Sequence, residues 1–139
     1  ARVLAAGRPA VRAGFAVPST MDAGAATVRD WFGYVANDPA GGTFLGSNRV
    51  GSWANYLIRV SEEGDFAITA RVGAAGTTGR IEALLDAGSV ATVAVPRTGG
   101  MTLWQDLSVG TVHLTPGLHV VRVRFAAIGF SVKSITVAR

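Results

Sequence analysis

The chain has 139 residues, of which 49% are hydrophobic, and this size and composition predict one domain around a single packed core. It contains no cysteine, which excludes disulfide bonds and cysteine-based metal or redox sites, and no apolar run approaches the roughly 20 residues of a membrane span. The net charge of +4 comes from arginines that are spread singly along the chain, so we expect no nucleic-acid partner.

The first third of the chain is irregular. We interpret residues 1–9 as a linker or N-terminal extension, because the chain begins with Ala1 rather than Met, as a processed or excised domain would. The domain itself is expected to span residues 10–139. Within it, residues 10–17 predict a strand and residues 18–27 predict a loop.

A dense aromatic segment follows at residues 29–38. It contains Trp31, Phe32 and Tyr34 and leads into a bend that is rich in glycine and proline. By alternation at least one of the three rings belongs to the core, and Phe32 is the one we predict there.

The rest of the chain alternates apolar and polar residues with a period of two. In "HVVRVRF" two valines and the Phe point one way, while the two arginines point the other way. Turns such as "EEGD", "DAGS" and "RTGG" separate these stretches. Short strands joined by tight turns predict an all-β fold, an antiparallel β-sandwich. The predicted strands are residues 66–72, 80–86, 89–95, 119–125 and 130–137.

The polar residues form no recognisable catalytic set. A glycosidase needs two carboxylates about 5–10 Å apart across a cleft, and no acid–base motif of that kind occurs. No Ser–His–Asp set, phosphate-binding loop or zinc spacing occurs either. His113 and His119 lie on predicted strands and are interpreted as exposed or hydrogen-bonded residues rather than metal ligands. We therefore expect a protein that is not an enzyme.

The motifs "GSWANYLIRV", "EGDFAITARV", "TGGMTLWQDL" and "VHLTPGLHVVRVRF", with the final strand "FSVKSITV", resemble the carbohydrate-binding modules of family 6 and the related family 35. The similarity follows the family's order over about the last two-thirds of the chain. It implies a jelly-roll β-sandwich that binds glycans and has no enzymatic activity. It also implies a usual attachment to a secreted polysaccharide-degrading enzyme.

The same resemblance implies a sugar site in the loops at one end of the sandwich. Trp104 corresponds to the second Trp of the family's Gly-Trp-x-x-Trp element and is expected to form one wall. The first Trp of that element is Met101 here, and the opposite aromatic falls on Ser47. The family's Asn falls on Ser131 and its Glu on Gly14. The resemblance therefore implies a degenerate version of the standard site.

Other residues are expected to complete this site. A sugar presents an apolar face of C–H groups to an aromatic ring and a rim of hydroxyl groups to polar side chains. The segment at residues 29–38 supplies the missing wall if it folds over the end of the sandwich. The candidates are Trp31 and Tyr34 for the wall, and Asn48, Arg97 and Gln105 for polar contacts.

The family also has a second surface, on the concave face of one sheet, and Trp53 holds the corresponding position here. The alternative for Trp53 is packing in the core or against the sheet, and partial burial is also the alternative for Trp104. Some members of the family bind a structural calcium ion through acidic residues near both ends of the chain. The stretch "AVRAGFAV" lacks such acids, so we expect no cofactor, with a structural calcium ion bound by other ligands as the alternative.

Two functions remain open from the sequence. The one we favour is a glycan-binding module that directs an attached, secreted enzyme to a polysaccharide. The other is a structural or self-associating extracellular sandwich that has lost sugar binding. A mean hydropathy of +0.35 and a charged fraction of 16% suit the second, in which "VATVAVP" pairs with neighbouring molecules through a sheet edge.

Overall fold

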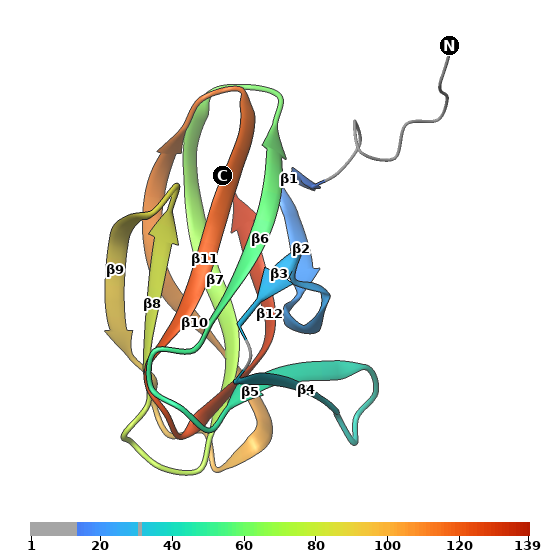
Figure 1. The fold of residues 1–139 in the computed structure, drawn as a ribbon, viewed down its shortest axis with the longest axis vertical. Coiled ribbons are helices and arrows are strands. Elements are labelled where there is room, and N and C mark those ends of the chain that lie inside the picture. The colour runs from blue at the N-terminus through green and yellow to red at the C-terminus, as the bar shows by residue number, and fades with distance from the viewer. Residues whose placement is uncertain (1–13, 31) are drawn as a thin grey trace.

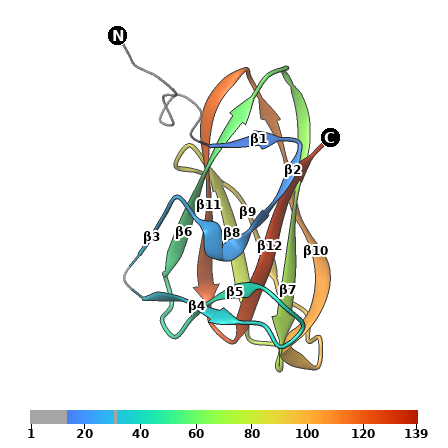
Figure 2. The same ribbon diagram turned by 90° about the vertical axis from the view of Figure 1, so that its right-hand side faces the viewer.

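The computed structural model describes residues 14–30 and 32–139, which form two β-sheets packed face to face, as Figure 1 and Figure 2 show. Sheet A contains β1 (Phe15–Val17), β3 (Val28–Arg29), β6 (Trp53–Val60), β8 (Arg80–Leu85), β9 (Gly88–Ala94) and β11 (Gly117–Ala127). Sheet B contains β2 (Ser19–Asp22), β4 (Gly33–Asn37), β5 (Thr43–Ser47), β7 (Gly64–Ala74), β10 (Gly100–Leu114) and β12 (Phe130–Ala138).

The chain crosses between the two sheets at most of its connections, apart from the β4–β5 and β8–β9 hairpins. Sheet A runs β1-β6-β11-β8-β9, with β3 also paired to β6, and sheet B runs β10-β7-β12-β5-β4, with β2 also paired to β12. A short 3₁₀ turn, η2 (Ala23–Ala25), follows β2. In the described part of the chain no helix is long and apolar enough to cross a membrane. The predicted all-β sandwich is confirmed.

The period-two pattern decides which side chains enter the core. The five predicted strands are confirmed as parts of β7, β8, β9, β11 and β12. On β11, Val121, Val123 and Phe125 are at most 1% exposed, and their burial stabilises the fold by roughly 1.5–3 kcal/mol each. Arg122 and Arg124 between them therefore lie on the outer face of sheet A.

Two expectations for the first third of the chain are wrong. One strand pairing of the sandwich is parallel, that of β1 with β6, and the long connection between them permits this direction. Residues 18–27 are not only loop, since they contain β2, in which only Met21 faces the core deeply. Phe32 is 45% exposed, because it lies in the turn before β4, where strand alternation does not apply. Residues 10–13 of the predicted first strand lie outside the described range.

A large bulge in β10 shapes one end of sheet B. Gly100 pairs with Ala74 and Gln105 pairs with Val72, so the residues between Gly100 and Gln105 face the single residue Gly73. A Cβ atom on Gly73 would lie 2.6 Å from the carbonyl oxygen of Met101, which explains the glycine. The motif "TGGMTLWQDL" therefore contains the β-bulge at the start of β10. Figure 2 shows β4 and β5 crossing the same end of the molecule.

Candidate functional site

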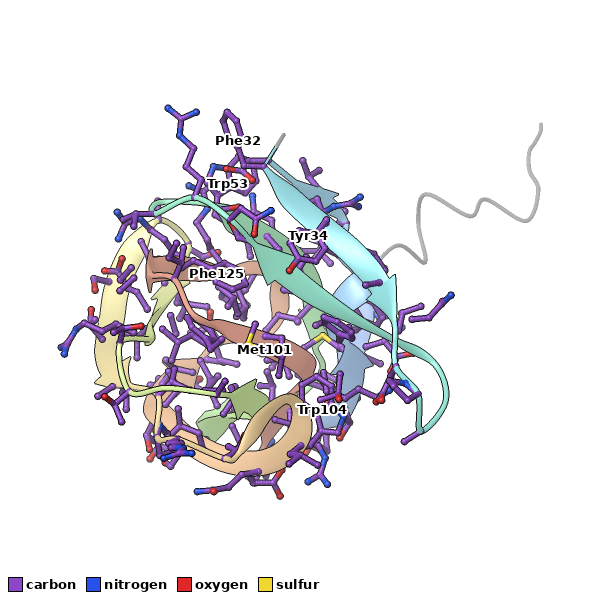
Figure 3. The ribbon with its side chains drawn as sticks, turned by 90° about the horizontal axis from the view of Figure 1, so that it is seen from below. Phe32, Tyr34, Trp53, Met101, Trp104 and Phe125 are labelled. Atoms are coloured by element: carbon purple, nitrogen blue, oxygen red, sulfur yellow. The ribbon has the colours of Figure 1, made fainter. Side chains whose placement is uncertain are left out.

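Two partly buried tryptophans lie on the outer faces of the two sheets. Trp53 begins β6 in sheet A, and Trp104 lies in the bulge of β10 in sheet B. Figure 3 shows the two rings well apart, with Tyr34 and Met101 located between them in this view. Each tryptophan has its own set of polar neighbours, so the two surfaces are described separately.

On sheet A, the guanidinium group of Arg122 lies over the indole ring of Trp53. The Cζ atom of Arg122 lies 4.1 Å from the ring centroid, and its Nε donates to Oδ1 of Asn55 at 2.8 Å. Arg122 and Asn55 are paired neighbours on β11 and β6, so the strand register holds all three side chains together. A guanidinium group that lies flat on an aromatic ring keeps its in-plane N–H donors available for other partners.

A pocket of about 270 Å³ opens beside this pair on the outer face of sheet A. The residues that line it are Asn55, Asp86, Ala87, Val120 and Arg122. The pocket therefore combines an amide, a carboxylate and a guanidinium group with small apolar side chains. This is the chemistry that the hydroxyl rim and the C–H face of a sugar require.

One wall of the pocket is the β8–β9 turn, where Asp86 and Ala87 have φ angles of 48° and 72°. The carboxylate of Asp86 accepts hydrogen bonds from the backbone N–H of Val120 at 2.8 Å and from Nδ1 of His119 at 2.7 Å. The other ring nitrogen of His119 lies 2.7 Å from the carbonyl oxygen of Thr115. Both nitrogens therefore face acceptors, and the protonated imidazolium ring satisfies both.

Electrostatics support this arrangement. The hydrogen bond to Asp86 is the main cause that raises the pKa of His119, although burial acts in the opposite direction. For Asp86, burial is the largest single cause and acts to raise the pKa. The hydrogen bonds from His119 and Val120 together outweigh burial, so the pKa of Asp86 is lowered. The pair thus joins the turn to β11 while His119 is charged.

Beside Trp53, a second arginine is already paired. Nη1 of Arg124 lies 3.1 Å from Oε1 of Glu82, whose other oxygen accepts a hydrogen bond from Ser89 at 2.8 Å. Arg124 is the cross-strand neighbour of Trp53. Glu82 therefore neutralises Arg124, and within residues 14–30 and 32–139 Arg122 has no carboxylate partner of its own.

The turn before β4 adds an exposed aromatic ring next to this face. Oδ1 of Asp30 accepts hydrogen bonds from the backbone N–H groups of Phe32 and Gly33 and from the hydroxyl group of Ser52 at 2.7 Å. The backbone N–H of Asp30 donates to the carbonyl oxygen of Trp53 at 3.0 Å. These bonds hold Phe32 near Trp53, and Figure 3 shows the two rings at the same edge.

On sheet B, Trp104 is held by a buried carboxylate. Its Nε1–H donates to Oδ2 of Asp38 at 2.7 Å, and Nζ of Lys133 donates to the same oxygen at 2.7 Å. The side chain of Asp38 is only 1% exposed. The hydrogen bond from Lys133, followed by that from the N–H of Ala40, is the main cause that lowers the pKa of Asp38. The ring of Phe44 packs against Trp104, with centroids 5.7 Å apart.

Near Trp104, the end of sheet B carries a row of small residues. Tyr34 on β4 pairs with Gly46 on β5, which pairs with Ser131 on β12, which pairs with Gly73 on β7. A Cβ atom on Gly46 would lie 2.6 Å from Cζ of Tyr34, so the phenol ring lies directly over this glycine. Tyr34 remains 36% exposed, and it pairs with Gly46, the residue before Ser47, where the missing wall was expected.

Ser131 does not serve as the polar contact that the sequence predicts. It is 0% exposed, and its hydroxyl group donates to the carbonyl oxygen of Met101 inside the bulge. Ser131 therefore ties β12 to β10 from below, and we leave it out of the binding surface.

The remaining predicted residues are dispersed. Ser47 is 6% exposed and its hydroxyl group binds the backbone of Arg49, so it shapes the β5–β6 turn. Asn48, Arg97 and Gln105 are exposed, and in the part of the chain that the structure describes no hydrogen bond joins their side chains to that of Trp104. Trp31 lies outside the described residues.

The histidines and acidic residues build hydrogen bonds rather than a metal centre. Nδ1 and Nε2 of His113 lie 2.7 Å from Asp65 and 2.7 Å from Glu63, and these contacts raise the pKa of His113. Within residues 14–30 and 32–139, no group of three or more His, Asp or Glu side chains is placed to hold a metal ion.

Sequence reasoning missed Asn55, Arg122 and Asp86 as candidate binding residues. The alternation already places Arg122 on an outer face, and Asn55 lies two residues after Trp53 on the same side of its strand. The signal that brings them together is the β6–β11 register, which the sequence does not contain. Asp86 enters the pocket only because the β8–β9 turn folds over β11.

The two packed sheets and their strand order define a β-sandwich of the jelly-roll class. The sequence profile of the carbohydrate binding module of family 6 matches residues 26–139, which is most of the chain. The chain therefore belongs to the family 6 carbohydrate-binding modules, which are non-catalytic accessories of glycoside hydrolases. No curated protein sequence matches the chain.

Several solved structures share this fold. The C-terminal family 6 module of LamC, a marine laminarinase from Zobellia galactanivorans, is 25% identical with a TM-score of 0.79, over 87% of this chain and 98% of that one. The module of Cellvibrio mixtus lichenase 5A, solved with cellotriose, is 24% identical with a TM-score of 0.75, over 88% and 98%. A β-1,3-glucan-binding module from Bacillus halodurans is 23% identical with a TM-score of 0.73, over 90% and 98%.

Proposed function

We propose that this module binds a polysaccharide through the outer face of sheet A, in the pocket between Asn55, Asp86 and Arg122. The observation that carries the proposal is the presence of a hollow, hydrogen-bonding groups and an aromatic support in one place. Val120 and the turn residue Ala87 offer apolar contacts to the C–H face of a sugar ring, while the polar groups meet its hydroxyl rim.

Trp53 contributes to this site mainly by supporting Arg122. Stacking on the indole orients the guanidinium group, so less side-chain freedom is lost when a ligand binds. The amide of Asn55 also accepts from Nε of Arg122, which fixes the guanidinium plane from a second side. The site is therefore organised before the ligand arrives.

The ligand class to test first is a glucan or xylan with pyranose rings. The titles of similar structures name cellotriose, cellobiose, xylose and β-1,3-glucan as ligands of those modules. We propose further that the parent polypeptide carries a secreted glycanase, and that this module holds the enzyme on its insoluble substrate.

The outer end of sheet B is a second candidate surface, because two flat side chains, Tyr34 and Trp104, are partly exposed there. This surface offers fewer hydrogen-bonding groups to a ligand than the pocket on sheet A does. The indole N–H of Trp104 is already used by Asp38, and Ser131 is buried. Exposed Gln105 and Arg97 are the polar groups left for a ligand on this side.

A titration series separates the two surfaces. The 139-residue chain is titrated by calorimetry with cello-oligosaccharides, laminari-oligosaccharides and xylo-oligosaccharides. Trp53→Ala and Asn55→Ala are expected to weaken binding at least about tenfold, or about 1.4 kcal/mol. Trp104→Ala, which changes the same residue type on the other sheet, is expected to leave affinity within a factor of about two of the parent value.

The reverse pattern, in which only Trp104→Ala abolishes binding, would assign the function to sheet B. An absence of binding to every glycan, together with concentration-dependent assembly in sedimentation experiments, would favour the structural and self-associating role instead.

A further inference from the structure

We infer that the outer face of sheet A selects an anionic polysaccharide, whose carboxylate or sulfate groups pair with the guanidinium groups of Arg49 and Arg122. This inference rests on the proposed function, because it names the ligand class of the same face. It follows from the charges around Trp53 and Phe32, which are not balanced within the protein.

Arg122 presents free donors next to the pocket. Its Nε is used by Asn55 and its flat face by Trp53, but in the described part of the chain neither terminal NH₂ group has a hydrogen-bond acceptor. Carboxylates and sulfates fit the fork of a guanidinium group with two parallel hydrogen bonds, which a neutral hydroxyl group cannot do. A charged substituent on the sugar in the pocket therefore gains a strong partner there.

Arg49 repeats the arrangement at the neighbouring aromatic ring. Its Cζ atom lies 4.2 Å from the ring centroid of Phe32, which is 45% exposed. Hydrogen bonds between its backbone and the hydroxyl group of Ser47 hold the β5–β6 turn that carries it. Among the described residues, no carboxylate lies within ion-pair distance of Arg49. The nearby carboxylate of Asp30 is engaged by Ser52 and two backbone N–H groups.

The two arginines belong to one basic surface. Arg124 lies between them, since it pairs with Trp53 on the neighbouring strand and a Cβ atom on Gly51 would lie 3.8 Å from its Nη2. Of these three guanidinium groups, only that of Arg124 is paired to a carboxylate in the described chain, Glu82 at 3.1 Å. At the pocket's far wall, Asp86 is offset by the charged ring of His119. The surface therefore keeps an excess of positive charge, which favours an anion.

Matched polymers that differ only in charge test this inference. The full chain is titrated with hydroxyethyl cellulose, carboxymethyl cellulose and cellulose sulfate, and with dextran, carboxymethyl dextran and dextran sulfate. We expect at least one charged form of a backbone to bind about tenfold or more tightly than its neutral form in 50 mM NaCl. The carboxymethyl and sulfate arms show which anion is preferred, and the gain is expected to shrink as NaCl rises.

Variants of equal charge separate a built site from general attraction. Arg122→Gln and Arg49→Gln are expected to remove most of the gain, and Arg122→Lys is expected to restore only part of it, because Lys lacks the planar fork. The matched control is Arg71→Gln, which removes the same charge from the outer face of sheet B, where Arg71 pairs with Asp106 in solvent. It is expected to keep the gain. Thermal unfolding confirms that each variant is folded.

Several results would overturn the inference. Equal affinity for neutral and charged forms would remove it while leaving the proposed function intact. If Arg71→Gln and Arg122→Gln reduce the affinity gain for charged polymers equally, the gain reflects only general attraction of anions to a positively charged protein. Binding of single-stranded DNA that is as tight as that of the charged glycans, and equally sensitive to Arg122→Gln, would reassign the surface to nucleic acid. If no polymer binds, both the inference and the proposed function are lost.

Discussion

The environments of Trp104 and Trp53 contain the same ingredients, an indole ring, a cation and hydrogen-bonding groups, but they combine them differently. At Trp104 a single oxygen of Asp38 accepts from both the indole N–H and Lys133, in a carboxylate that is 1% exposed. At Trp53 the cation on the ring face is Arg122, and among the described residues no carboxylate forms an ion pair with it.

This difference separates a structural network from a recognition surface. At Trp104, Asp38 and Lys133 are paired with each other, so this network fastens the β4–β5 hairpin to sheet B and offers little to a ligand. Around Trp53 and Phe32, two guanidinium groups are oriented by aromatic rings and left with unused donors. These donors form their hydrogen bonds only when a ligand binds, so the free energy of those bonds contributes to binding rather than to folding.

The largest effect that would sharpen the comparison is expected at Gly73. A Cβ atom there would meet the carbonyl oxygen of Met101 at 2.6 Å, and because the three nearest atoms all belong to the backbone of β10, they cannot move aside as a flexible side chain does. Gly73→Ala is expected to lower the free energy of unfolding by about 1–3 kcal/mol. Urea unfolding measures it, with Gly76→Ala as the control, since nothing lies within 4 Å of a Cβ at Gly76.

Glycan affinity adds a second readout to the same variant. Because the bulge belongs to sheet B, the folded fraction of Gly73→Ala is expected to keep the affinity of the sheet A pocket. A variant as stable as Gly76→Ala would mean that the bulge does not depend on this close approach.

A smaller effect is expected from acid at Asp38. Its pKa is lowered below 3.8, so the charged network contributes stability that is fully present above pH 3.8 and is lost as pH falls through the lower folded-state pKa. Asp38→Asn is therefore expected to melt at a lower temperature than the parent chain at pH 7 and to approach it near pH 2. Thermal melts between pH 2 and pH 7 check this, with exposed Asp106→Asn as the control.

A curve for Asp38→Asn that runs parallel to the parent at all pH values would contradict the role of the Lys133–Asp38 pair. It would also weaken the contrast between the two tryptophan environments, since Trp104 would then be held mainly by packing against Phe44.

A still smaller effect is expected at the pocket wall in alkali. The pKa of His119 is raised above 6.5, so its bond to Asp86 contributes stability that is fully present below pH 6.5 and is lost as pH rises through the raised folded-state pKa. Glycan affinity of the parent chain is expected to decline over that rise, whereas His119→Gln binds more weakly at pH 6 and with little pH dependence.

The control for this measurement is His113→Gln. His113 also has a raised pKa, but its partners Glu63 and Asp65 lie at the β6–β7 turn and outside the pocket. His113→Gln is expected to change the pH dependence of melting and not that of glycan affinity. Identical binding profiles for His119→Gln and the parent would remove His119 from the pocket's organisation.

The smallest effect is expected at Gly46, in the same row as Gly73. A Cβ atom at Gly46 would meet the ring of Tyr34, which is the far end of a partly exposed side chain and is able to swing outward. Gly46→Ala is expected to cost about 0.5 kcal/mol or less. Urea unfolding beside Gly73→Ala checks it, and a loss as large as that of Gly73→Ala would show that Tyr34 is held as firmly as the bulge.

Much of the fold was predictable because it depends on local periodicity. The stretch "HVVRVRF" alone indicates a half-buried strand, and the observed burial of its valines and Phe125 follows that pattern. The prediction failed at Phe32 and at β2. Phe32 lies in a turn fixed by Asp30, and β2 is only four residues long, too short for alternation to stand out.

The candidate site was predictable only in part. The sequence pointed to Trp104 and Tyr34 as flat side chains at the end of the sandwich, and both are partly exposed there. It could not show that Trp104 bonds to Asp38, which is 66 residues away, or that Ser131 is buried under the bulge. These facts depend on how a hairpin docks on a distant sheet.

The sequence by itself determined most of the strands, the core faces and, through its motifs, the family. These follow from alternation, turn residues and short sequence motifs, all of which are local in the chain. The tertiary structure alone decided which arginines have carboxylate partners and which do not. Ion pairs and stacked rings form between strands far apart in the chain, so their partners are set by sheet order and register, and no local pattern encodes them.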